Sequence, residues 1–388
     1  MILYSVYFII LIIALLYLRF KFVYKFWILQ PVFHFYDFHY YYSNPQIIKS
    51  SLPSITKYVD FISIKSNNFE NVIESEIQKC LFLIKNYYYR DNFCIFNPEI
   101  INFLPYFKGH NSCCFMSVYW HKDLYRDKNS HIFDHQKVIG VITSRPISIK
   151  INNEKFNSYY VDYLCVHKNY RKKGIAPKLI QTHEYFQRHN NLKISTSFFK
   201  REGELTGIVP LCYYQTHCYK INDILVFNKL DPGVKMIAVD RQNIQYLIHF
   251  IDEITHYQSI IHTELANIIS LIETKNLLIY ISIQNNVLLS AFFYRKTCVY
   301  YGNKELFSLF ASIKSSDLST NHFFDHFQFS LSTYFFGNQH ISIEEIGDNN
   351  LLTKMITKNL IISTSPTAYF LYNYIAQPIK AEKVLIIL

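Results

Sequence analysis

Glycine and proline are scarce in this chain: 388 residues include only 9 Gly and 11 Pro, so turn signals are few. The eight cysteines carry no metal or disulfide signature, because they are scattered, form no CxxC pair, and accompany no N-x-S/T sequon in an Asn-rich sequence. These absences favour free thiols in a reduced, cytosolic compartment. An RNP-like motif, a zinc finger and a long basic run are also missing, which argues against nucleic acid as a partner.

Aromatic residues and positive charge are abundant instead. The chain has 33 Tyr and 33 Phe, which we attribute to A/T-biased codons, so a single aromatic residue is a weak functional signal. The formal net charge of +10 favours an anionic partner, such as a phosphate-bearing ligand or a membrane surface. The length suits two domains rather than one core.

The first 18 residues, MILYSVYFIILIIALLYL, contain no charge and would span roughly 27 Å as a helix. Arg19, Lys21 and Lys25 follow directly, so the positive-inside tendency predicts a transmembrane helix over residues 1–20 with the body of the protein in the cytosol. A cleaved signal peptide is less consistent, because a basic n-region and an A-x-A site are missing. A buried core helix is the remaining alternative.

A β-rich run over residues 159–166 leads into a basic loop with one glycine, Gly174, and Pro177 then opens an amphipathic helix. Free loop amides and the positive end of a helix dipole together bind phosphate. Arg171, Gly174 and Ala176 form the R-x-x-G-x-A spacing of the acyl-CoA loop in GNAT-type acyltransferases. An ordinary βα turn with a solvated basic face is the bland alternative.

Three sequence motifs, which occur in the expected order along the chain, indicate a more specific class of acyltransferase. Residues 164–177, LCVHKNYRKKGIAP, resemble the signature of glycylpeptide N-tetradecanoyltransferases, also called N-myristoyltransferases. Residues 24–32, YKFWILQPV, resemble the N-terminal Y-x-F-W-x-T-Q-P-V of that family, and residues 369–374, YFLYNY, resemble its Y-Y-L-Y-N-W. The chain then ends in the apolar run 384–388, like the final strand of the family.

The resemblance implies an α+β fold of two GNAT-like (acyl-CoA N-acyltransferase) halves with pseudo-twofold symmetry, here preceded by the transmembrane helix. We expect an acyl-CoA-binding domain over residues 21–228 and a peptide-binding domain over residues 229–388, with the seam near Pro232-Gly233. Helices are expected around 69–88, 241–257, 264–274 and 319–336. Strands are expected at 113–120, 138–143, 147–151, 159–166, 224–227, 277–284 and 287–295.

The resemblance also implies the reaction and its residues. A glycine α-amine would attack the thioester of myristoyl-CoA, with the backbone amides of Tyr163 and Leu164 as the oxyanion hole and the carboxylate of Leu388 as the base. A bulge in the strand would free those amides. The residues expected to bind acyl-CoA are Tyr24, Lys25, Phe26, Trp27, Leu164, Cys165, Val166, His167, Lys168, Arg171, Lys172, Lys173, Gly174, Ile175, Ala176 and Pro177. Those expected to bind the acceptor are Asp91, Phe93, Asp162, Thr196, Tyr294 and Tyr372.

No permanent cofactor or metal is implied, and the expected partners are glycine peptides, acyl-CoA and a membrane, with the protein a monomer. His322 and His326 lie one helical turn apart but lack a third ligand, and Cys165 with His167 lacks an orienting acid for nucleophilic chemistry. The acidic loop of the family is reduced to Asp91, so we expect a relaxed demand for basic residues in the acceptor. Two alternatives remain: an inactive relative that binds acyl-CoA or lipidated partners, and a GNAT N-acetyltransferase.

Overall fold

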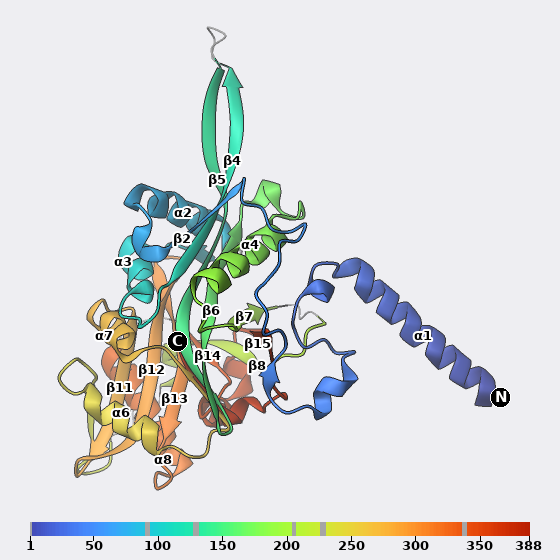
Figure 1. The fold of residues 1–388 in the computed structure, drawn as a ribbon. Coiled ribbons are helices and arrows are strands. Elements are labelled where there is room, and N and C mark those ends of the chain that lie inside the picture. The colour runs from blue at the N-terminus through green and yellow to red at the C-terminus, as the bar shows by residue number, and fades with distance from the viewer. Residues whose placement is uncertain (1, 90–93, 127–131, 204–206, 226–229, 336–339) are drawn as a thin grey trace.

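The protein has a mixed α/β fold built on a long, twisted sheet (Figure 1). The computed structural model describes residues 2–89, 94–126, 132–203, 207–225, 230–335 and 340–388. The described strands of the main sheet and its partners are β2 (Ile64–Asn68), β3 (Cys94–Phe96), β4 (Phe115–Arg126), β5 (Ile132–Ile151), β6 (Glu154–Val166), β7 (Ser197–Glu202), β8 (Cys212–Lys220), β9 (Lys235–Ala238), β10 (Ser259–His262), β11 (Leu277–Gln284), β12 (Val287–Tyr301), β13 (Lys304–Lys314), β14 (His340–Glu344), β15 (Ser363–Tyr372) and β17 (Val384–Ile387).

The same order of elements occurs twice. Antiparallel strands β4, β5 and β6 are followed by helix α4 (Ile175–Asn190) and by β7, which runs parallel to β6. Antiparallel strands β11, β12 and β13 are followed by α8 (Thr320–Tyr334) and by β14, which runs parallel to β13. Each return is a strand–helix–strand crossover, the connection that parallel strands require.

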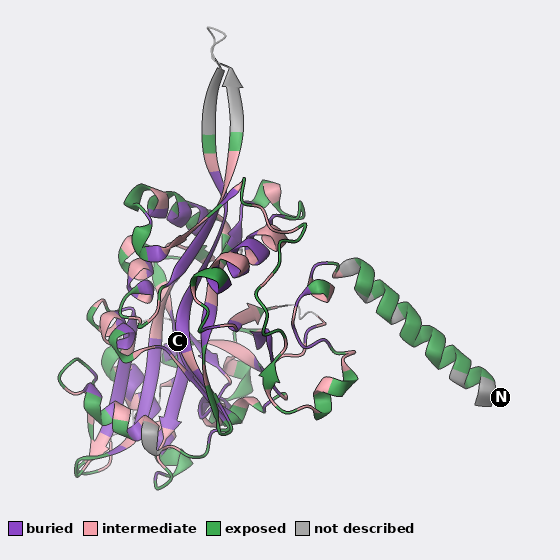
Figure 2. Cartoon of the chain, in the orientation of Figure 1, coloured by how far each residue is buried: buried purple, intermediate pink, exposed green. Residues whose placement is uncertain are grey.

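Side chains along each strand point alternately to the two faces of the sheet. Both faces are apolar, and helices cover both of them in each half. In the first half α2 (Glu74–Tyr87) packs on the face that carries Val118 and Val141, and α4 packs on the face that carries Ile139 and Ile142. Gly140 lets α4 approach β5 closely, because a Cβ there would lie 2.7 Å from Leu179 Cδ1. Figure 2 shows the buried strands as a continuous band.

The second half repeats this layering with four helices. Helices α6 (Ile244–Glu253) and α7 (Leu265–Glu273) pack on Ile279, Ile281 and Phe293, while α8 and α9 (Asn349–Met355) pack on Tyr280 and Phe292. Neighbouring residues along one strand therefore face opposite cores, as the period of two requires. The short elements α3 (Ile100–Phe103) and α5 (Ile221–Ile224), the two-residue strand pair β1 (Gln46–Ile47) with β16 (Tyr374–Ile375), and several 3₁₀ turns complete the described fold.

Strands from late in the sequence join the two halves. β15 lies between β7 and β8, and β8 continues to β14 of the second half. β17 pairs in parallel with β10, which in turn pairs with β5. Alternate residues of β17 enter two different core clusters, so the strand is buried on both faces.

The N-terminal helix α1 (Ile2–Val23) extends away from the body (Figure 1). The transmembrane helix expected over residues 1–20 is not supported, because no helix among the described residues combines the length and apolarity of a bilayer-spanning segment. Described side chains of α1 such as Tyr7 and Phe8 are each 64% exposed.

Two strand predictions needed correction. The strands expected at 138–143 and 147–151 are one strand, β5, because Pro146 falls between Ser144, which pairs with β4, and Ser148, which pairs with β10. On the edge of β5 that pairs first with β4 and then with β10, no strand lies opposite Pro146, so the N–H that proline lacks is not needed there. The strand expected at 224–227 is wrong at Ile224, which ends helix α5, and residues 226–229 lie outside the described residues.

Candidate active site

Strand β6 bulges at Tyr163 and Leu164. Val141 pairs with Cys165 and Thr143 pairs with Asp162, so two residues of β6 oppose one residue of β5. Tyr163 has φ +49°, a left-handed conformation that is costly for a tyrosine, and Leu164 is 37% exposed. Such a bulge takes backbone amides out of the ladder and turns them toward a site.

Asp162 occupies one of the amides that the bulge releases. Its Oδ1 accepts a hydrogen bond of 2.9 Å from the Tyr163 N–H, and its carbonyl oxygen accepts one of 3.0 Å from Thr143 Oγ1. A carboxylate therefore accepts from one of the two amides that the sequence analysis predicted as oxyanion donors. The sequence alone did not predict this contact.

The basic loop before α4 has the expected exposed amides. Lys172 and Gly174 adopt φ +63° and +77°, and Gly174 is the N-cap of α4. A Cβ on Gly174 would meet no atom within 4 Å, so the glycine is required by its backbone conformation rather than by crowding. Within the described chain, the amides of Lys172, Lys173 and Gly174 donate to no backbone carbonyl.

Arg171 ties this loop to the end of β6. Its Nε donates to the Val166 carbonyl at 3.0 Å, and its Nη2 donates to the Tyr87 carbonyl. The nearby His167 has a lowered pKa because of burial and of the positive charges on Lys137 and Lys168. The loop is thus tied to β6 and cationic, and its exposed amides at the start of α4 have the character of an anion-binding loop.

The N-terminal aromatic block packs against the same part of the sheet. Phe26 is buried, and the Trp27 ring stacks on Phe199 with centroids 5.9 Å apart. The Tyr372 hydroxyl lies 2.6 Å from Glu184 Oε2 and 2.7 Å from Gln30 Oε1, which joins this block to β15 and α4. Tyr24 is half-buried and Lys25 is exposed.

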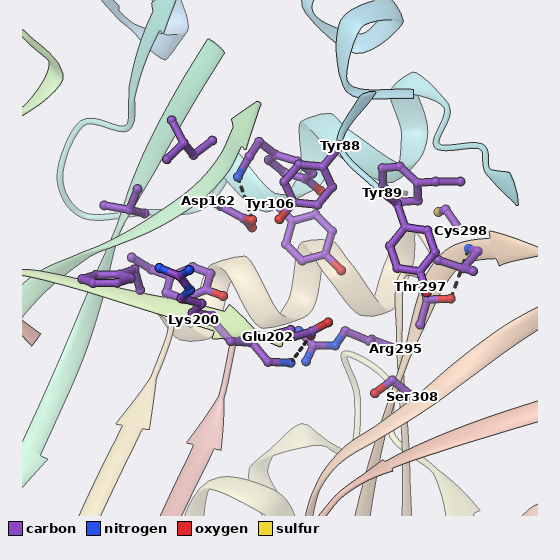
Figure 3. Close-up of a pocket in the computed structure, with 18 of the residues that line it drawn as sticks. Tyr88, Tyr89, Tyr106, Asp162, Lys200, Glu202, Arg295, Thr297, Cys298 and Ser308 are labelled. Atoms are coloured by element: carbon purple, nitrogen blue, oxygen red, sulfur yellow. Dashed lines mark hydrogen bonds and ion pairs between the residues drawn. The ribbon is translucent and has the colours of Figure 1, made fainter. Parts of the chain in front are cut away.

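A cavity of about 860 Å³ opens beside the bulge. Its wall includes Trp27, Asp162, Tyr163, Leu164 and Tyr372 among the residues predicted for the site. Figure 3 shows Asp162 with tyrosines on one side of the cavity and Lys200, Glu202 and Arg295 on the facing side. The cavity therefore brings together residues from both halves of the sequence.

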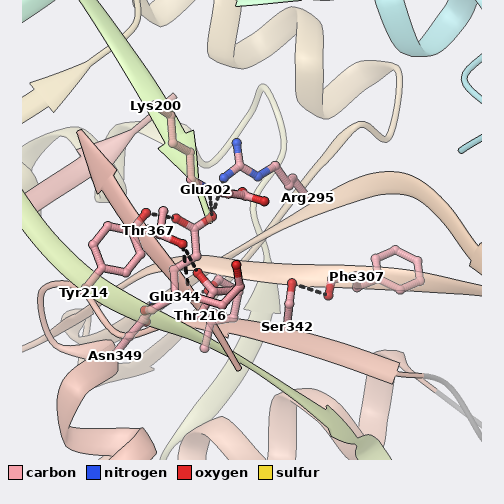
Figure 4. A network of polar contacts seen from close by, with 12 residues as sticks. Lys200, Glu202, Tyr214, Thr216, Arg295, Phe307, Ser342, Glu344, Asn349 and Thr367 are labelled. Atoms are coloured by element: carbon pink, nitrogen blue, oxygen red, sulfur yellow. Dashed lines mark hydrogen bonds and ion pairs between the residues drawn. The ribbon is translucent and has the colours of Figure 1, made fainter. Parts of the chain in front are cut away.

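A buried ion network forms the floor of this cavity (Figure 4). Glu344 Oε1 lies 3.1 Å from Lys200 Nζ and 2.6 Å from Arg295 Nη2, and Tyr214 donates to Glu344 Oε2. Burial alone would raise the pKa of Glu344, but the charges of Lys200 and Arg295 outweigh it and lower the pKa to about 2. Lys200 also pairs at 3.1 Å with Glu202, whose side chain is 54% exposed.

Leu388 is buried at the end of β17. It packs in the same core cluster as Ile147 and Tyr160, and Tyr160 also lines the cavity. Leu388 itself is not among the described residues that line the cavity.

The other residues predicted to bind the acceptor are not found among the described residues of the cavity wall. Asp91 and Phe93 lie outside the described residues. Thr196 and Tyr294 are buried away from the cavity wall, where Thr196 Oγ1 donates to the Asn157 carbonyl and the Tyr294 hydroxyl bonds Ser330.

The alternative sites considered from sequence have ordinary structural roles. His322 pairs with Asp231 at 2.8 Å, the buried His326 bonds Ser282, and no described group of three ligands could hold a metal ion. Burial raises the pKa of the Cys165 thiol to about 12, and the thiol donates weakly to the Leu83 carbonyl at 3.8 Å. A thiol so hard to ionise is a poor nucleophile.

Comparison with known proteins gives the class first. The structure superposes on Saccharomyces cerevisiae N-myristoyltransferase solved with bound myristoyl-CoA, with a TM-score of 0.70, 14% identity, and coverage of 92% of this chain and 89% of that chain. A second solved structure of the yeast enzyme, with bound myristoyl-CoA and inhibitors, gives a TM-score of 0.71 at 15% identity and covers 92% and 91% of the two chains. At this identity the likeness establishes the fold.

Sequence comparison finds a family similarity over part of the chain. Residues 59–212 match the family model of the Myristoyl-CoA:protein N-myristoyltransferase N-terminal domain. Glycylpeptide N-tetradecanoyltransferases of Dictyostelium discoideum and Candida albicans are 26% identical over 110 residues and 29% identical over 102 residues, which cover 28% and 25% of this chain. The chain spans about a quarter of the length of these curated relatives, 26% and 22% respectively. Over residues 59–212 this chain is therefore similar to the N-terminal domain of the N-myristoyltransferase family.

Proposed function

We propose that the protein transfers a tetradecanoyl group from myristoyl-CoA to the N-terminal glycine amine of acceptor proteins. The observation that carries the proposal is the bulge at Tyr163 and Leu164, which lies on the cavity wall at one end of β6 while the basic loop follows that strand. Myristoyl-CoA is the donor substrate, and no permanent cofactor takes part.

In the proposed reaction the glycine nitrogen attacks the thioester carbon, the C–S bond breaks, and the CoA thiolate leaves and takes the remaining proton of the attacking amine to become the thiol. The amides of Lys172–Ala176 and the N-terminus of α4 hold the pyrophosphate, while Trp27 and Phe26 cover the acyl chain. The amides of Tyr163 and Leu164 stabilise the oxyanion once Asp162 turns from the Tyr163 N–H toward the glycine ammonium. The Leu388 carboxylate takes the ammonium proton.

A direct assay tests this proposal. Incubation with myristoyl-CoA and a glycine peptide is expected to release free CoA thiol and to add one tetradecanoyl mass to the peptide. Acetyl-CoA in a parallel reaction is expected to give little product; the reverse preference would favour an N-acetyltransferase. Absence of transfer with either donor contradicts the proposal.

Deletion of Leu388 tests the base. The deletion moves the terminal carboxylate back by one residue, so we expect kcat to fall by about 100-fold or more, the size of a general-base contribution. Leu388→Val keeps the carboxylate in place and serves as the control, and the Kd for myristoyl-CoA is expected to stay unchanged in both. A kcat that survives the deletion would show that another group takes the proton.

An inactive acyl-CoA-binding relative is the second candidate function. The contact between Asp162 Oδ1 and the Tyr163 amide favours it, because this carboxylate blocks one of the two proposed oxyanion donors. Tight binding of a non-hydrolysable myristoyl-CoA analogue without any transfer would identify this function.

We further propose that α1 associates with a membrane and that the body faces the cytosol as a monomer. The support is the exposed apolar surface of α1 and the basic residues Arg19, Lys21 and Lys25 that follow its apolar part. Residues 24–388 are expected to leave the membrane fraction that the full chain occupies. An unchanged distribution would remove the basis for this proposal.

A further inference from the structure

Arg145 is a buried arginine in the wall of the cavity, and it pairs with no carboxylate among the described residues. It lies on β5 between Ser144 and Pro146, is 1% exposed, and is one of the residues that line the cavity. Its guanidinium carbon lies 5.2 Å from the ring centroids of both Tyr106 and Tyr160. Its Nε and Nη1 have no hydrogen-bond partner in the described part of the chain.

The carboxylates of the cavity do not neutralise Arg145. Glu344 is engaged by Lys200 and Arg295, Asp162 Oδ1 is engaged by the Tyr163 amide, and no ion pair joins Arg145 to any described carboxylate. The positive charge of Arg145 also acts on His110. Burial lowers the pKa of His110 to about 4, and the charge of Arg145 contributes to this lowering. Burying an unpaired cation is costly, so its presence at a cavity wall indicates that a partner arrives with a ligand.

The geometry of Arg145 favours a carboxylate as that partner. Two tyrosine rings near the guanidinium stabilise its charge through cation–π contacts but satisfy none of its N–H donors. Those donors lie in the plane of the guanidinium, where they match the two oxygens of a carboxylate.

The phosphates of CoA are too far away to be this partner. Arg145 pairs with Tyr160, whereas the basic loop begins after Val166, six residues further along β6 or roughly 20 Å at the rise of a strand. The thioester would lie between these points, beside Tyr163 and Leu164. An acceptor that enters from the side opposite to CoA therefore passes Arg145.

We propose that Arg145 binds the carboxylate of an acidic side chain located within the first four residues after the acceptor glycine. Tyr160 lies two residues from Asp162 along β6, about 7 Å, which an extended peptide covers in two to three residues. The proposal rests on the proposed acyl transfer and names the class of acceptor that this pocket selects.

Matched acceptor peptides test the proposal. Glycine peptides that carry Glu or Gln at one of the second to fifth positions are compared by kcat/KM. At one position we expect the Glu peptide to exceed the Gln peptide by about 10-fold or more, the effect of one charge-assisted pair. Arg145→Gln is expected to abolish this ratio and Arg145→Lys to restore part of it, while activity on the Gln peptide stays within about threefold.

Arg241→Gln is the control, because it removes the same charge from an arginine whose side chain is 78% exposed and which is not among the cavity-lining residues. Arg241→Gln is expected to keep the full Glu preference. Arg145→Met guards against misfolding: it replaces an unpaired buried charge with an apolar side chain, so its Tm is expected to equal or exceed that of the wild type. A Tm well below that of the wild type would give Arg145 a structural role and overturn the proposal.

Peptide binding in the presence of a non-hydrolysable myristoyl-CoA analogue separates the two proposals. Transfer with equal kcat/KM for Glu and Gln peptides overturns the role of Arg145 and leaves the proposed function standing. If the protein binds the Glu peptide more tightly than the Gln peptide, Arg145→Gln removes this difference, and no acyl transfer occurs, the result supports the anion site and contradicts the proposed enzyme activity. Inorganic phosphate that lowers the binding of both peptides equally marks a general anion effect and overturns the proposed selectivity.

Discussion

Two cations and a phenol converge on the buried carboxylate of Glu344. Glu344→Gln would leave Lys200 and Arg295 as partly buried cations without a full counter-charge. We expect unfolding free energy to fall by about 3–5 kcal/mol, the usual cost of breaking a buried pair. Urea denaturation at neutral pH measures this.

Glu202→Gln is the matched control, since Glu202 pairs with the same Lys200 at the same 3.1 Å but has a side chain that is 54% exposed. Screening by solvent limits its expected effect to about 1 kcal/mol or less. Equal losses in the two variants would show that the burial of Glu344 does not matter.

The pH dependence of stability follows from the same carboxylate. Its pKa in the folded protein, about 2, lies below the ordinary value of 4.5, so its contribution is fully present above about pH 4.5 and is lost as the pH falls toward 2. The stability difference between wild type and Glu344→Gln should therefore shrink across this range. A difference that stays constant down to pH 2 would contradict the assignment.

At the scale of elements, the loop before α4 depends on Gly174. Gly174→Val cannot adopt φ +77° without strain of about 1–2 kcal/mol, so the loop would lose its amide arrangement and the Kd for myristoyl-CoA should rise about 10-fold. Isothermal titration with a non-hydrolysable analogue measures this.

Gly302→Val provides the control, because Gly302 has φ +61° and open space around it, in the turn between β12 and β13. It carries similar strain away from the loop, and its Kd should match that of the wild type. A weakened Kd in both variants would point to general destabilisation.

Elements with strong periodicity were predictable from sequence. The strand expected at 277–284 is confirmed at β11, and the helix expected at 319–336 is confirmed at α8, within two residues at each end. These segments carry a clear alternation or an apolar stripe bounded by polar residues. The bulge in β6 was expected only because the family resemblance pointed to those amides.

The floor of the cavity was not predictable in the same way. Arg145, Lys200, Arg295 and Glu344 lie far apart in the sequence, and each resembles a surface charge on a strand. They come from β5, β7, β12 and β14, so their meeting at one cavity depends on strand order and register, which no local pattern encodes. A charged residue within an apolar strand, such as Arg145 before Pro146, was the available signal.

At the scale of the whole molecule, the expected division into domains of residues 21–228 and 229–388 remains a prediction. The strand order of the sheet suggests a test of it. β7 and β8 both pair with β15, so a fragment of residues 21–228 lacks the strand between them. We expect this fragment to show no cooperative thermal transition, while the full chain unfolds in one transition. A folded fragment with its own transition would show that the first half is an autonomous domain.

The ion network that crosses the cavity also limits how this protein can be varied. Lys200 is encoded before residue 229, whereas Arg295 and Glu344 are encoded after it. A recombination crossover near residue 229 between distant homologues would separate one cation from its anion. Functional members of a chimeric library should therefore take Lys200, Arg295 and Glu344 from the same parent, even though about 140 codons separate the first from the last.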